Sequence, residues 1–391
     1  MKRWLALWFA ALGLSLPAVA AAPGLSVENG VLLKDEQPFH GIGANYFSLF
    51  SRLLQNPSDT SSLTNLATLA QARIPFVRFM GGGFWPVEQR LYLTNRADFF
   101  RRLDQVVRCA ETNGIGLIPS LFWNAATVPD LVGERLDEYG NPDSKTIAFI
   151  RRYTAEVVQR YHDSPAIWGW EFGNEYNLAC DLPNASEHRP PVWPTLGTAK
   201  ARTERDELKF AQVRVAVVAF AETVRQFDKT RIIVSGNSIP RSSAWHNVQE
   251  KQWTPDTAVQ FEEILRRDNP DPINAISVHL YPERQGGYSG GATNIAGAVS
   301  AANRCATQAG RPLFLGEFGV AQQLGPRAQQ EAVFAEFLDA IVEQGVPLAA
   351  FWVFDLDSQE QDWNVSFHND RAWMIDLVGK ANARLRGPSK R

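Results

Sequence analysis

Short continuous runs of apolar residues alternate along the chain with longer segments of helical periodicity. The short runs are rich in Val, Ile, Leu and Phe, which is typical of parallel strands that are covered on both faces. They predict strands at Gly41–Phe47, Phe76–Met80, Ile115–Phe122, Ile167–Phe172, Ile232–Ser235, Ile276–Leu280, Leu313–Phe318 and Leu348–Phe354. A short N-terminal hairpin is predicted before them, at Val31–Phe39.

The segments between the predicted strands carry apolar residues at helical spacing. In one of them, Phe99, Leu103, Val106 and Ala110 lie on a single helical face. The predicted helices are Leu63–Ala72, Phe99–Ala110, Thr146–Tyr161, Leu208–Phe227, Val259–Arg266, Ile295–Thr307, Gln329–Glu343 and Trp373–Arg384. Repeated strand–helix units form either an open doubly wound sheet or a closed barrel. Eight units without a Gly-x-Gly-x-x-Gly motif after the first strand favour an α/β fold of the (β/α)8 TIM-barrel type.

The chain has 391 residues, whereas a bare barrel of this type takes about 250. No Ser/Gly-rich linker divides the sequence, so residues 23–391 are expected to form a single barrel domain. The additional residues lie in long loops after four of the strands, at Tyr176–Thr198, Asn237–Pro255, Pro282–Asn294 and Asp355–Asn369. Loops that follow barrel strands surround the face where barrel enzymes hold their active sites.

The N-terminus has the pattern of a secretory signal peptide. Lys2 and Arg3 precede an apolar run from Trp4 to Leu16, and small residues suited to cleavage follow the run. A membrane anchor is the alternative interpretation, but the apolar run is too short to span a bilayer comfortably. We therefore expect removal of residues 1–22 and a secreted or periplasmic mature protein that has no contact with a membrane.

Composition narrows the classes of partner. The 39 Lys and Arg residues are balanced by 42 Asp and Glu residues, for a formal net charge of −3. This balance predicts neither nucleic-acid binding nor a polybasic membrane patch. Three cysteines, Cys109, Cys180 and Cys305, allow at most one disulfide, and we expect none. Paired Cys/His spacings are missing from the sequence, so we expect neither a metal nor a cofactor. We also expect a monomer.

Two glutamates follow strongly apolar strands at the predicted active-site face. Glu175 comes just after Ile167–Phe172, and Glu317 lies near the end of Leu313–Phe318. A carboxylate at such a position is costly unless it is paired or functional, and either glutamate alone could belong to a structural ion pair. Together they fit a retaining glycosidase, in which two carboxyl groups about 5–5.5 Å apart flank the scissile bond. A negative nucleophile nearby should raise the pKa of the acid.

The wider set of polar residues at these strand ends resembles a known group of enzymes. The dipeptide Asn174-Glu175, together with Glu317 and Arg78, is similar to the pattern of clan A glycoside hydrolases. A His-x-Tyr motif after the sixth strand and a tryptophan after the eighth make the chain resemble glycoside hydrolase family 5: His279, Tyr281 and Trp352. The resemblance covers essentially the whole mature chain.

This resemblance implies a role for each residue of the set. Glu175 would be the general acid/base and Glu317 the nucleophile. Asn174 would bind the sugar 2-hydroxyl, a contact that strengthens in an oxocarbenium-like transition state. The other residues would bind substrate or hold the carboxylates: Arg78 and Tyr281 would keep Glu317 ionised by lowering its pKa, His279 would orient Glu175 or donate to substrate, and Trp352 would form the floor of a sugar subsite.

Details of the third strand favour one branch of the family. Many family 5 cellulases carry a His near its end, whereas this chain has Trp123 and Asn124 there and so resembles the β-mannanases. We therefore expect a β-linked polysaccharide substrate, β-1,4-mannan, hydrolysed with retention of configuration. An endo-β-1,4-glucanase, a transglycosylase and an inactive carbohydrate-binding barrel are the alternatives.

The tryptophans divide by their predicted positions. Trp168 and Trp170 lie within a strand and are expected to pack in the core. Four others fall at strand ends or in loops after strands, where we expect them to stack on sugars: Trp85, Trp123, Trp352 and Trp363.

Overall fold

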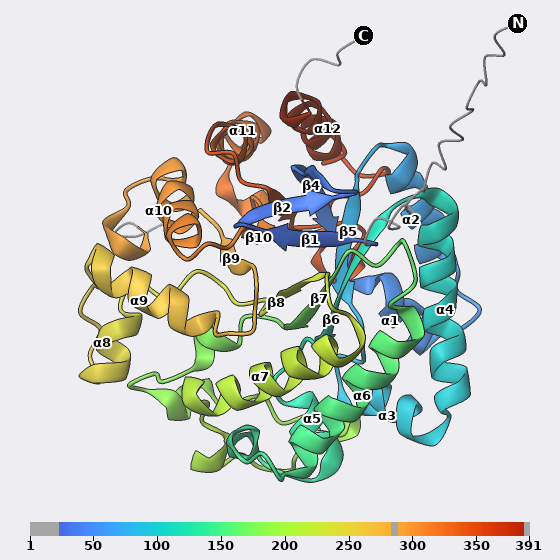
Figure 1. The fold of residues 1–391 in the computed structure, drawn as a ribbon, viewed down its shortest axis with the longest axis vertical. Coiled ribbons are helices and arrows are strands. Elements are labelled where there is room, and N and C mark those ends of the chain that lie inside the picture. Colours follow the sequence, from blue (N-terminus) through green and yellow to red (C-terminus); the bar gives the residue numbers. More distant parts are fainter. Residues whose placement is uncertain (1–22, 283–287, 387–391) are drawn as a thin grey trace, which may run out of the picture.

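The computed structural model describes residues 23–282 and 288–386, so the predicted signal peptide at residues 1–22 lies outside the described residues. Parallel strands form one eight-stranded sheet in the order β8-β7-β6-β5-β4-β11-β10-β9. They are β4 (Gly41–Asn45), β5 (Phe76–Met80), β6 (Gly116–Phe122), β7 (Gly169–Gly173), β8 (Ile232–Val234), β9 (Ile276–Leu280), β10 (Leu313–Phe318) and β11 (Leu348–Phe351). Helices surround this sheet (Figure 1), which confirms the predicted (β/α)8 TIM barrel.

The barrel closes between its two edge strands, β8 and β9. Asn274, just before β9, donates its backbone N–H to the carbonyl of Ile233 over 3.2 Å. Its side-chain oxygen accepts the backbone N–H of Ile233 at 2.7 Å. At the other end of the seam, the backbone N–H of Ile239 donates to the carbonyl of His279 over 3.2 Å. Closure fixes the strands around a common axis, so side chains from distant parts of the sequence meet inside.

All eight predicted helices are present, with ends that differ by a few residues. They are α2 (Ser61–Gln71), α4 (Arg96–Asn113), α6 (Lys145–Tyr161), α7 (Phe210–Phe227), α9 (Ala258–Asp268), α10 (Ile295–Gln308), α11 (Arg327–Glu343) and α12 (Trp373–Leu385). Four shorter helices that follow strands were not predicted: α1 (Ser48–Gln55), α3 (Pro86–Thr94), α5 (Thr127–Val132) and α8 (Ala244–Gln249). Within the described ranges, none of the helices combines the length and apolar character that crossing a membrane requires.

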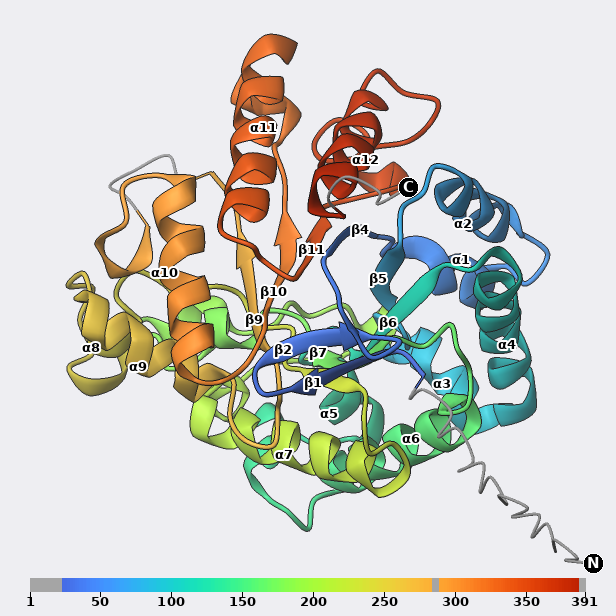
Figure 2. The same cartoon turned by 45° about the horizontal axis from the view of Figure 1, so that its top comes forward.

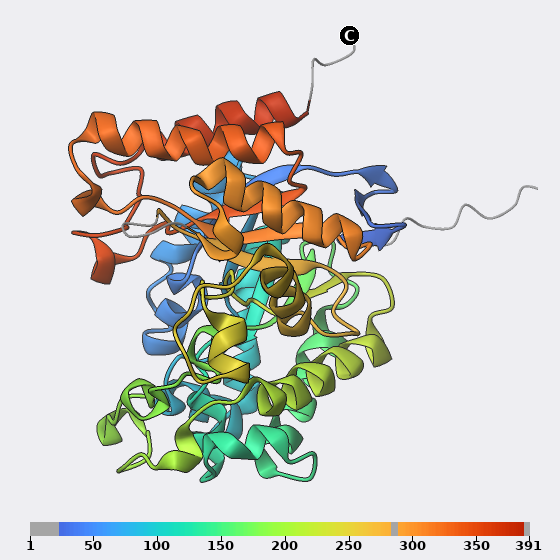
Figure 3. The same cartoon turned by 90° about the vertical axis from the view of Figure 1, so that its left-hand side faces the viewer.

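Three short antiparallel strands cover the N-terminal end of the barrel. β1 (Leu25–Glu28) pairs with β2 (Val31–Lys34), which pairs with β3 (Gln37–Pro38), so the predicted hairpin gains a third strand. β1 and β2 lie across the barrel opening in Figure 2, and Figure 3 shows them in blue at the right-hand end of the molecule. Leu25 and Leu32 are buried here in a cluster with strand residues Phe76, Ile118, Ile232, Val234 and Phe314. Because these strands cover the N-terminal end of the barrel, a binding cleft can open only at the opposite, carboxyl end.

Trp168 and Trp170 both pack in the core, as predicted. Trp168 is 6% exposed and meets Phe39 edge to face, with ring centroids 5.3 Å apart. Trp170 is fully buried and donates its indole N–H to Asp228 over 2.8 Å. The same carboxylate forms a buried ion pair with Arg231 at 2.8 Å. Trp170 therefore contributes a hydrogen bond to a buried charge as well as apolar area.

Replacing Trp170 with phenylalanine is expected to lower the free energy of unfolding by about 1–3 kcal/mol, because the buried carboxylate of Asp228 loses a donor. Thermal unfolding followed by circular dichroism measures the change. Trp168→Phe is the matched control, since no hydrogen bond of the Trp168 indole is found among the described residues. Equal destabilisation by both substitutions would contradict a specific role for the hydrogen bond.

The three cysteines are free thiols. Cys109 lies in α4 and Cys305 in α10, as predicted, and Cys180 follows a 3-10 turn in the long loop after β7. Burial raises the pKa of each thiol, which disfavours the reactive thiolate.

Candidate active site

A cleft of about 670 Å³ opens at the carboxyl ends of the barrel strands. A residue of β10 and residues that follow β4, β5, β6, β7, β9 and β11 line it. The lining residues are Phe47, Phe84, Trp123, Asn124, Ala125, Asn174, Glu175, Tyr176, Ala179, Leu208, Tyr281, Glu317, Trp352, Leu356, Ser358, Gln359 and Trp363. Seven of the nine predicted site residues therefore lie in one cavity, and the other two, Arg78 and His279, contact these residues from below.

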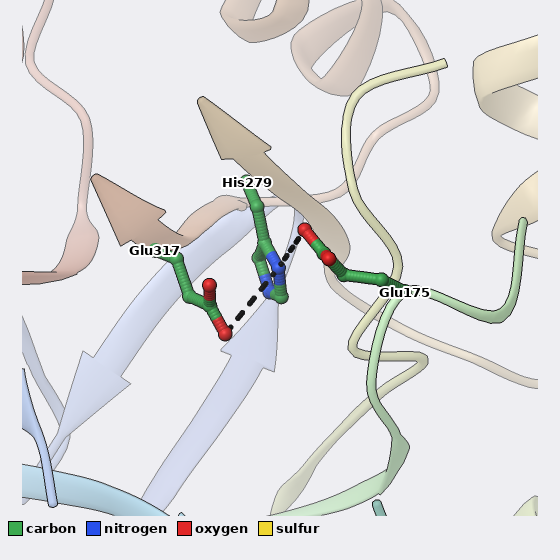
Figure 4. A group of neighbouring side chains, drawn as sticks. All are labelled: Glu175, His279 and Glu317. Carbon is green, nitrogen blue, oxygen red and sulfur yellow. Dashed lines mark hydrogen bonds and ion pairs between the residues drawn. The ribbon is translucent and has the colours of Figure 1, made fainter. Parts of the chain in front are cut away.

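The two predicted catalytic glutamates converge on one histidine. Figure 4 shows His279 between Glu175 and Glu317. Its Nδ1 lies 3.0 Å from Oε1 of Glu175 and 3.5 Å from Oε1 of Glu317. One oxygen of each carboxyl group and a ring nitrogen of His279 all lie within 4.8 Å of one another. The two carboxyl groups thus face a common space at the bottom of the cleft.

Glu317 is held rigidly at the end of β10. It is paired in register with His279 on β9, and its side chain is 5% exposed. Arg78 donates from Nη1 to its Oε1 over 2.7 Å, and the Tyr281 hydroxyl donates to its Oε2 over 2.6 Å. A Cβ at Gly316 would lie 2.9 Å from Nε2 of His279, so the preceding glycine leaves room for the ring. Both carboxylate oxygens of Glu317 therefore accept hydrogen bonds, which fix the orientation of the side chain.

Glu175 stands in a sharp turn just beyond β7. Its backbone is left-handed, with φ of +53°, and its N–H donates to the carbonyl of Gly236 over 2.8 Å. Gly236 also has positive φ, and a Cβ there would lie 1.9 Å from the carbonyl oxygen of Gly173. The turn therefore needs a glycine on the neighbouring loop. The Glu175 side chain is 29% exposed, so it reaches the cleft while Glu317 stays covered.

Arg78 links most of the predicted polar residues. It lies on β5, is completely buried, and donates from Nη1 to Asn45 and from Nη2 to Asn174 over 2.9 and 2.7 Å. Its Nε donates to both oxygens of Glu171, at 2.8 and 2.9 Å. Burial alone would lower the pKa of Arg78, but Glu171 and Glu317 more than offset this, so the pKa is raised and the charge is retained.

Burial raises the pKa of both glutamates above the ordinary range. At Glu317, the neighbouring His279 ring, the charge of Arg78 and the hydrogen bond from Tyr281 oppose the rise without reversing it. Arg78 and Tyr281 therefore lower the pKa of Glu317 as the family resemblance implies, but desolvation outweighs them and the net pKa is raised. At Glu175 the expected direction is confirmed, but burial and not the charge of Glu317 is the leading cause.

His279 is neutral at ordinary pH, since burial lowers its pKa to about 4. A neutral imidazole carries one proton. Within the described residues, Nε2 has no hydrogen-bond partner, whereas Nδ1 faces oxygens of Glu175 and Glu317. We therefore assign the proton to Nδ1, where acceptors are available. Burial likewise raises the pKa of Tyr281 well above its usual value, so this hydroxyl remains a donor.

Three of the four tryptophans expected to stack on sugars line the cleft: Trp123, Trp352 and Trp363. Trp352 and Trp363 are half-buried in the cleft wall, and the Trp352 indole N–H donates to Gln359 over 2.9 Å. Trp123 is 6% exposed and lies under the Arg78 guanidinium, 4.3 Å from its ring centroid, so one ring face is occupied. Trp85 does not line the cleft and packs edge to face against Phe84, which does.

Asn124 lines the cleft, but its side chain already forms hydrogen bonds within the protein. Its side-chain nitrogen donates to the carbonyl of Phe84 over 3.2 Å, and its oxygen accepts the backbone N–H of Ala126 at 3.1 Å. It therefore ties the loop after β6 to the loop after β5, and its contact with substrate stays a prediction.

The spacing of Glu175, His279 and Glu317 would also suit a metal ion, but the surrounding donors argue against one. Both oxygens of Glu317 already accept hydrogen bonds, and one of these comes from the cation Arg78. A second cation at the same oxygen would be repelled by the buried guanidinium. The charge pattern fits a nucleophile and an acid better than a ligand set.

Three features of the site were not predicted. Glu171 pairs with Arg78, Gln359 accepts the indole N–H of Trp352, and Phe47 packs edge to face against both Trp123 and Trp352. A signal existed for Glu171, because it is a lone carboxylate inside an otherwise apolar strand. Gln359 stands in a polar loop, where neighbouring residues give no comparable signal.

Known proteins resemble this chain over different extents. A family model described as Cellulase (glycosyl hydrolase family 5) matches residues 36–355, more than half of the chain. A probable mannan endo-1,4-beta-mannosidase A-1 of Aspergillus terreus is 40% identical over 87 residues, 20% of this chain and 22% of that protein. Mannan endo-1,4-beta-mannosidase F of Aspergillus fumigatus is 41% identical over 86 residues, 20% of this chain and 19% of that protein. The match thus spans about a fifth of these relatives' length.

Solved structures extend the likeness along the whole barrel. A glycoside hydrolase family 5 mannosidase from Rhizomucor miehei has a TM-score of 0.65 at 12% identity, covering 94% of this chain and 99% of that chain. An exo-beta-1,4-mannosidase from Opitutaceae bacterium strain TAV5 has a TM-score of 0.63 at 16% identity, covering 92% of this chain and 63% of that chain. Such identities show the fold. From the extent of the family match, the chain belongs to glycoside hydrolase family 5.

Proposed function

We propose that this protein is a secreted, retaining glycoside hydrolase that cleaves β-1,4-linked mannan. The observation that carries the proposal is the pair of carboxyl groups with oxygens within 4.8 Å, one covered and doubly hydrogen-bonded, the other open to the cleft. Carboxyl groups of inverting enzymes stand about 6.5–9.5 Å apart, which leaves room for a water molecule. The shorter separation here supports direct attack on the sugar.

The reaction proceeds through a covalent intermediate in two steps. In the first, the Glu317 carboxylate attacks the anomeric carbon while Glu175 gives its proton to the glycosidic oxygen, so the leaving sugar departs neutral. In the second, Glu175 takes a proton from water, the resulting nucleophile attacks the same carbon, and the Glu317 carboxylate is released. Two inversions give net retention.

The surroundings of the two glutamates support this division of roles. Glu317 accepts one hydrogen bond from a cation and one from a phenol, and these contacts favour its ionised form. Glu175 has His279 as its side-chain partner and sits at the cleft surface. Burial raises its pKa, so it holds a proton at higher pH than an ordinary glutamate. We assign the negative charge of the resting enzyme to Glu317.

Asn174 is placed to recognise the sugar beside the scissile bond. Its oxygen accepts from Nη2 of Arg78 over 2.7 Å, which fixes the amide and directs its NH2 group away from the guanidinium. The residue lines the cleft next to Glu175. The amide then donates to the 2-hydroxyl, a contact that strengthens as the ring approaches an oxocarbenium ion.

The cleft suits a neutral sugar chain. Glu175 and Glu317 are the charged side chains in the lining set, and aromatic rings form much of the remaining wall. An acidic polysaccharide would be repelled by the negative charge of Glu317. The relatives named as mannan endo-1,4-beta-mannosidases support mannan, while the cellulase description of the family model supports β-1,4-glucan as the second candidate.

A glycan panel tests the proposal. Reducing-end release should be largest on galactomannan and glucomannan and small on carboxymethylcellulose and xylan, and proton NMR should show the β-anomer as the first product. Higher activity on carboxymethylcellulose would move the substrate to β-1,4-glucan. Binding without hydrolysis would support an inactive carbohydrate-binding barrel, and long products at high acceptor concentration a transglycosylase.

Secretion rests on the leader-like N-terminus and needs its own test. The protein should be recovered from the culture medium or the periplasm of the producing cells. Intact mass spectrometry of this protein should show a chain that starts after Ala20 or Ala22. A full-length chain retained in the membrane fraction would instead support an anchor.

Replacing Trp352 with alanine is expected to raise KM for mannan about 10- to 100-fold, because a sugar loses its apolar platform, worth about 1.5–3 kcal/mol. Initial rates over a range of mannan concentrations measure it. Trp352→Phe is the matched control, since it keeps a ring but loses the N–H donated to Gln359. An effect of Trp352→Phe as large as that of Trp352→Ala would show that the hydrogen bond matters more than the ring.

A further inference from the structure

Arg78 is shared between two carboxylates on opposite sides of its guanidinium. One side contacts Glu317 at 2.7 Å, and the other contacts Glu171 at 2.8 Å. The Arg78 and Glu171 side chains have no exposed surface, and that of Glu317 is 5% exposed. The proposed mechanism uses Glu317 and Arg78 but gives Glu171 no task.

Glu171 is committed entirely to Arg78. Both of its oxygens accept from Nε, at 2.8 and 2.9 Å, and one of them also meets Nη2 at 2.8 Å. The pair extends from β7 to β5, two strands apart in the sheet. With Nε fixed on Glu171, the two remaining nitrogens are directed at Asn45, Asn174 and Glu317. The orientation of the guanidinium toward the nucleophile therefore depends on Glu171.

The same contact sets the local charge. Arg78 and Glu171 form a buried ion pair of zero net charge. Arg78 therefore has a counter-ion of its own and does not neutralise the charge of Glu317. Attack on the sugar turns the Glu317 carboxylate into a neutral ester. In that intermediate Arg78 still has its counter-ion, whereas without Glu171 it would be left as an unpaired buried cation, which is strongly unfavourable.

We propose that Glu171 is a positioning residue for the nucleophile: acting through Arg78, it orients the guanidinium and balances its charge so that Glu317 can give up its own charge during attack. This inference rests on the proposed role of Glu317. It predicts that loss of the Glu171 charge slows formation of the glycosyl-enzyme more than its hydrolysis, because an unbalanced Arg78 stabilises Glu317 as a free carboxylate.

Other groups also act on the ionisation of Glu317, and the test must hold them constant. They are Arg78 on β5, Glu171 on β7, Glu175 in the loop after β7, His279 on β9 and Tyr281 just after β9. Arg241, in the loop after β8, interacts with Glu175. Glu171→Gln removes the charge of Glu171 and leaves the volume of the side chain almost unchanged.

Titration of the Glu317 side chain gives a readout that does not depend on turnover. With 13C-labelled glutamate, and Glu317→Gln to assign the signal, we expect the apparent pKa of Glu317 to be lower by about one unit or more in Glu171→Gln. Glu171→Asp, which keeps the charge but withdraws it by one methylene, should shift the same way by less, and it decides the question if the glutamine variant does not fold. An unchanged midpoint in the folded variants would overturn the inference.

Kinetics on an aryl β-mannoside separate the two chemical steps. In Glu171→Gln we expect the rate of glycosylation to fall at least tenfold, with deglycosylation unchanged or faster, and the acid limb of kcat/KM to move to lower pH. Asp228→Asn is the matched control, because it removes a buried carboxylate from the ion pair with Arg231 at the other end of the barrel. It should lower Tm without moving the acid limb of kcat/KM. Equal slowing of both steps in Glu171→Gln would indicate a merely structural role.

The outcomes for the two proposals can be told apart. A wild-type protein that hydrolyses no β-glycan would overturn the role of Glu317, and with it the functional part of this inference. An active wild type combined with an unmoved Glu317 titration in Glu171→Gln would overturn the inference alone.

Discussion

Replacing Glu317 with glutamine is expected to reduce kcat on galactomannan by about four orders of magnitude, equivalent to ~5.4 kcal/mol of transition-state stabilisation. The amide keeps the shape of the side chain, and its oxygen can still accept from Arg78 or Tyr281, which contact the carboxylate at 2.7 and 2.6 Å in the wild type. It cannot form the glycosyl ester, because a neutral amide is a poor nucleophile. Reducing-end assays at high enzyme concentration measure the residual rate.

The chemical origin of this loss can be checked by rescue. In Glu317→Ala, added azide should occupy the space of the carboxylate and attack an activated aryl mannoside, yielding a glycosyl azide of inverted configuration. Unfolding midpoints close to that of the wild type would show that the variants are folded. If Glu317→Gln kept more than about one per cent of the wild-type kcat, the nucleophile would have to be another residue.

Local patterns were sufficient to predict the barrel. Each strand is a short apolar run with its own boundaries, and each long helix has a clear apolar face, so neither depends on knowing the partner elements. The short helices α1, α3, α5 and α8 escaped because they have six to nine residues, too few to show a periodicity. Their sequence patterns are equally compatible with loops.

The same reasoning explains which site residues were predicted. Glu175 and Glu317 stand at strand ends, where a polar residue after an apolar run is conspicuous. Glu171 faces the barrel interior, and its partner Arg78 lies 93 positions earlier in the chain. Their proximity is a property of the closed sheet, not of either segment. Arg78 was therefore predicted from the sequence, whereas Glu171 and the pair that the two residues form were not.

Electrostatics was the least predictable property of the site. Donors to Glu317 suggested a lowered pKa, yet its desolvation outweighs them and the pKa rises. Trp123 similarly lies beside the cleft as expected, but the Arg78 guanidinium covers one of its faces. Both outcomes depend on how deeply a side chain is buried, and burial follows from the packing of all strands together.

Replacing Glu175 with alanine is expected to separate substrates by their leaving groups. On mannan, where the departing sugar needs a proton, kcat/KM should fall by about 10²- to 10⁴-fold. A 2,4-dinitrophenyl mannoside needs no protonation, so its glycosylation should proceed at nearly the wild-type rate and be followed by slow hydrolysis. Stopped-flow absorbance should then show a burst of dinitrophenol. Asp181→Ala, which removes another acid at positive φ in the same loop, is the matched control and should show no burst.

The pH dependence of the same variant gives an independent readout. Glu175 acts in the first step as the protonated acid, so wild-type activity on mannan falls as pH rises through its pKa. Burial raises that pKa, which moves the alkaline limb above the range of an ordinary glutamate. In Glu175→Ala the alkaline limb should disappear while the acid limb, which reports protonation of Glu317, persists. An alkaline limb that survives unchanged in Glu175→Ala would assign the proton donor to a different group.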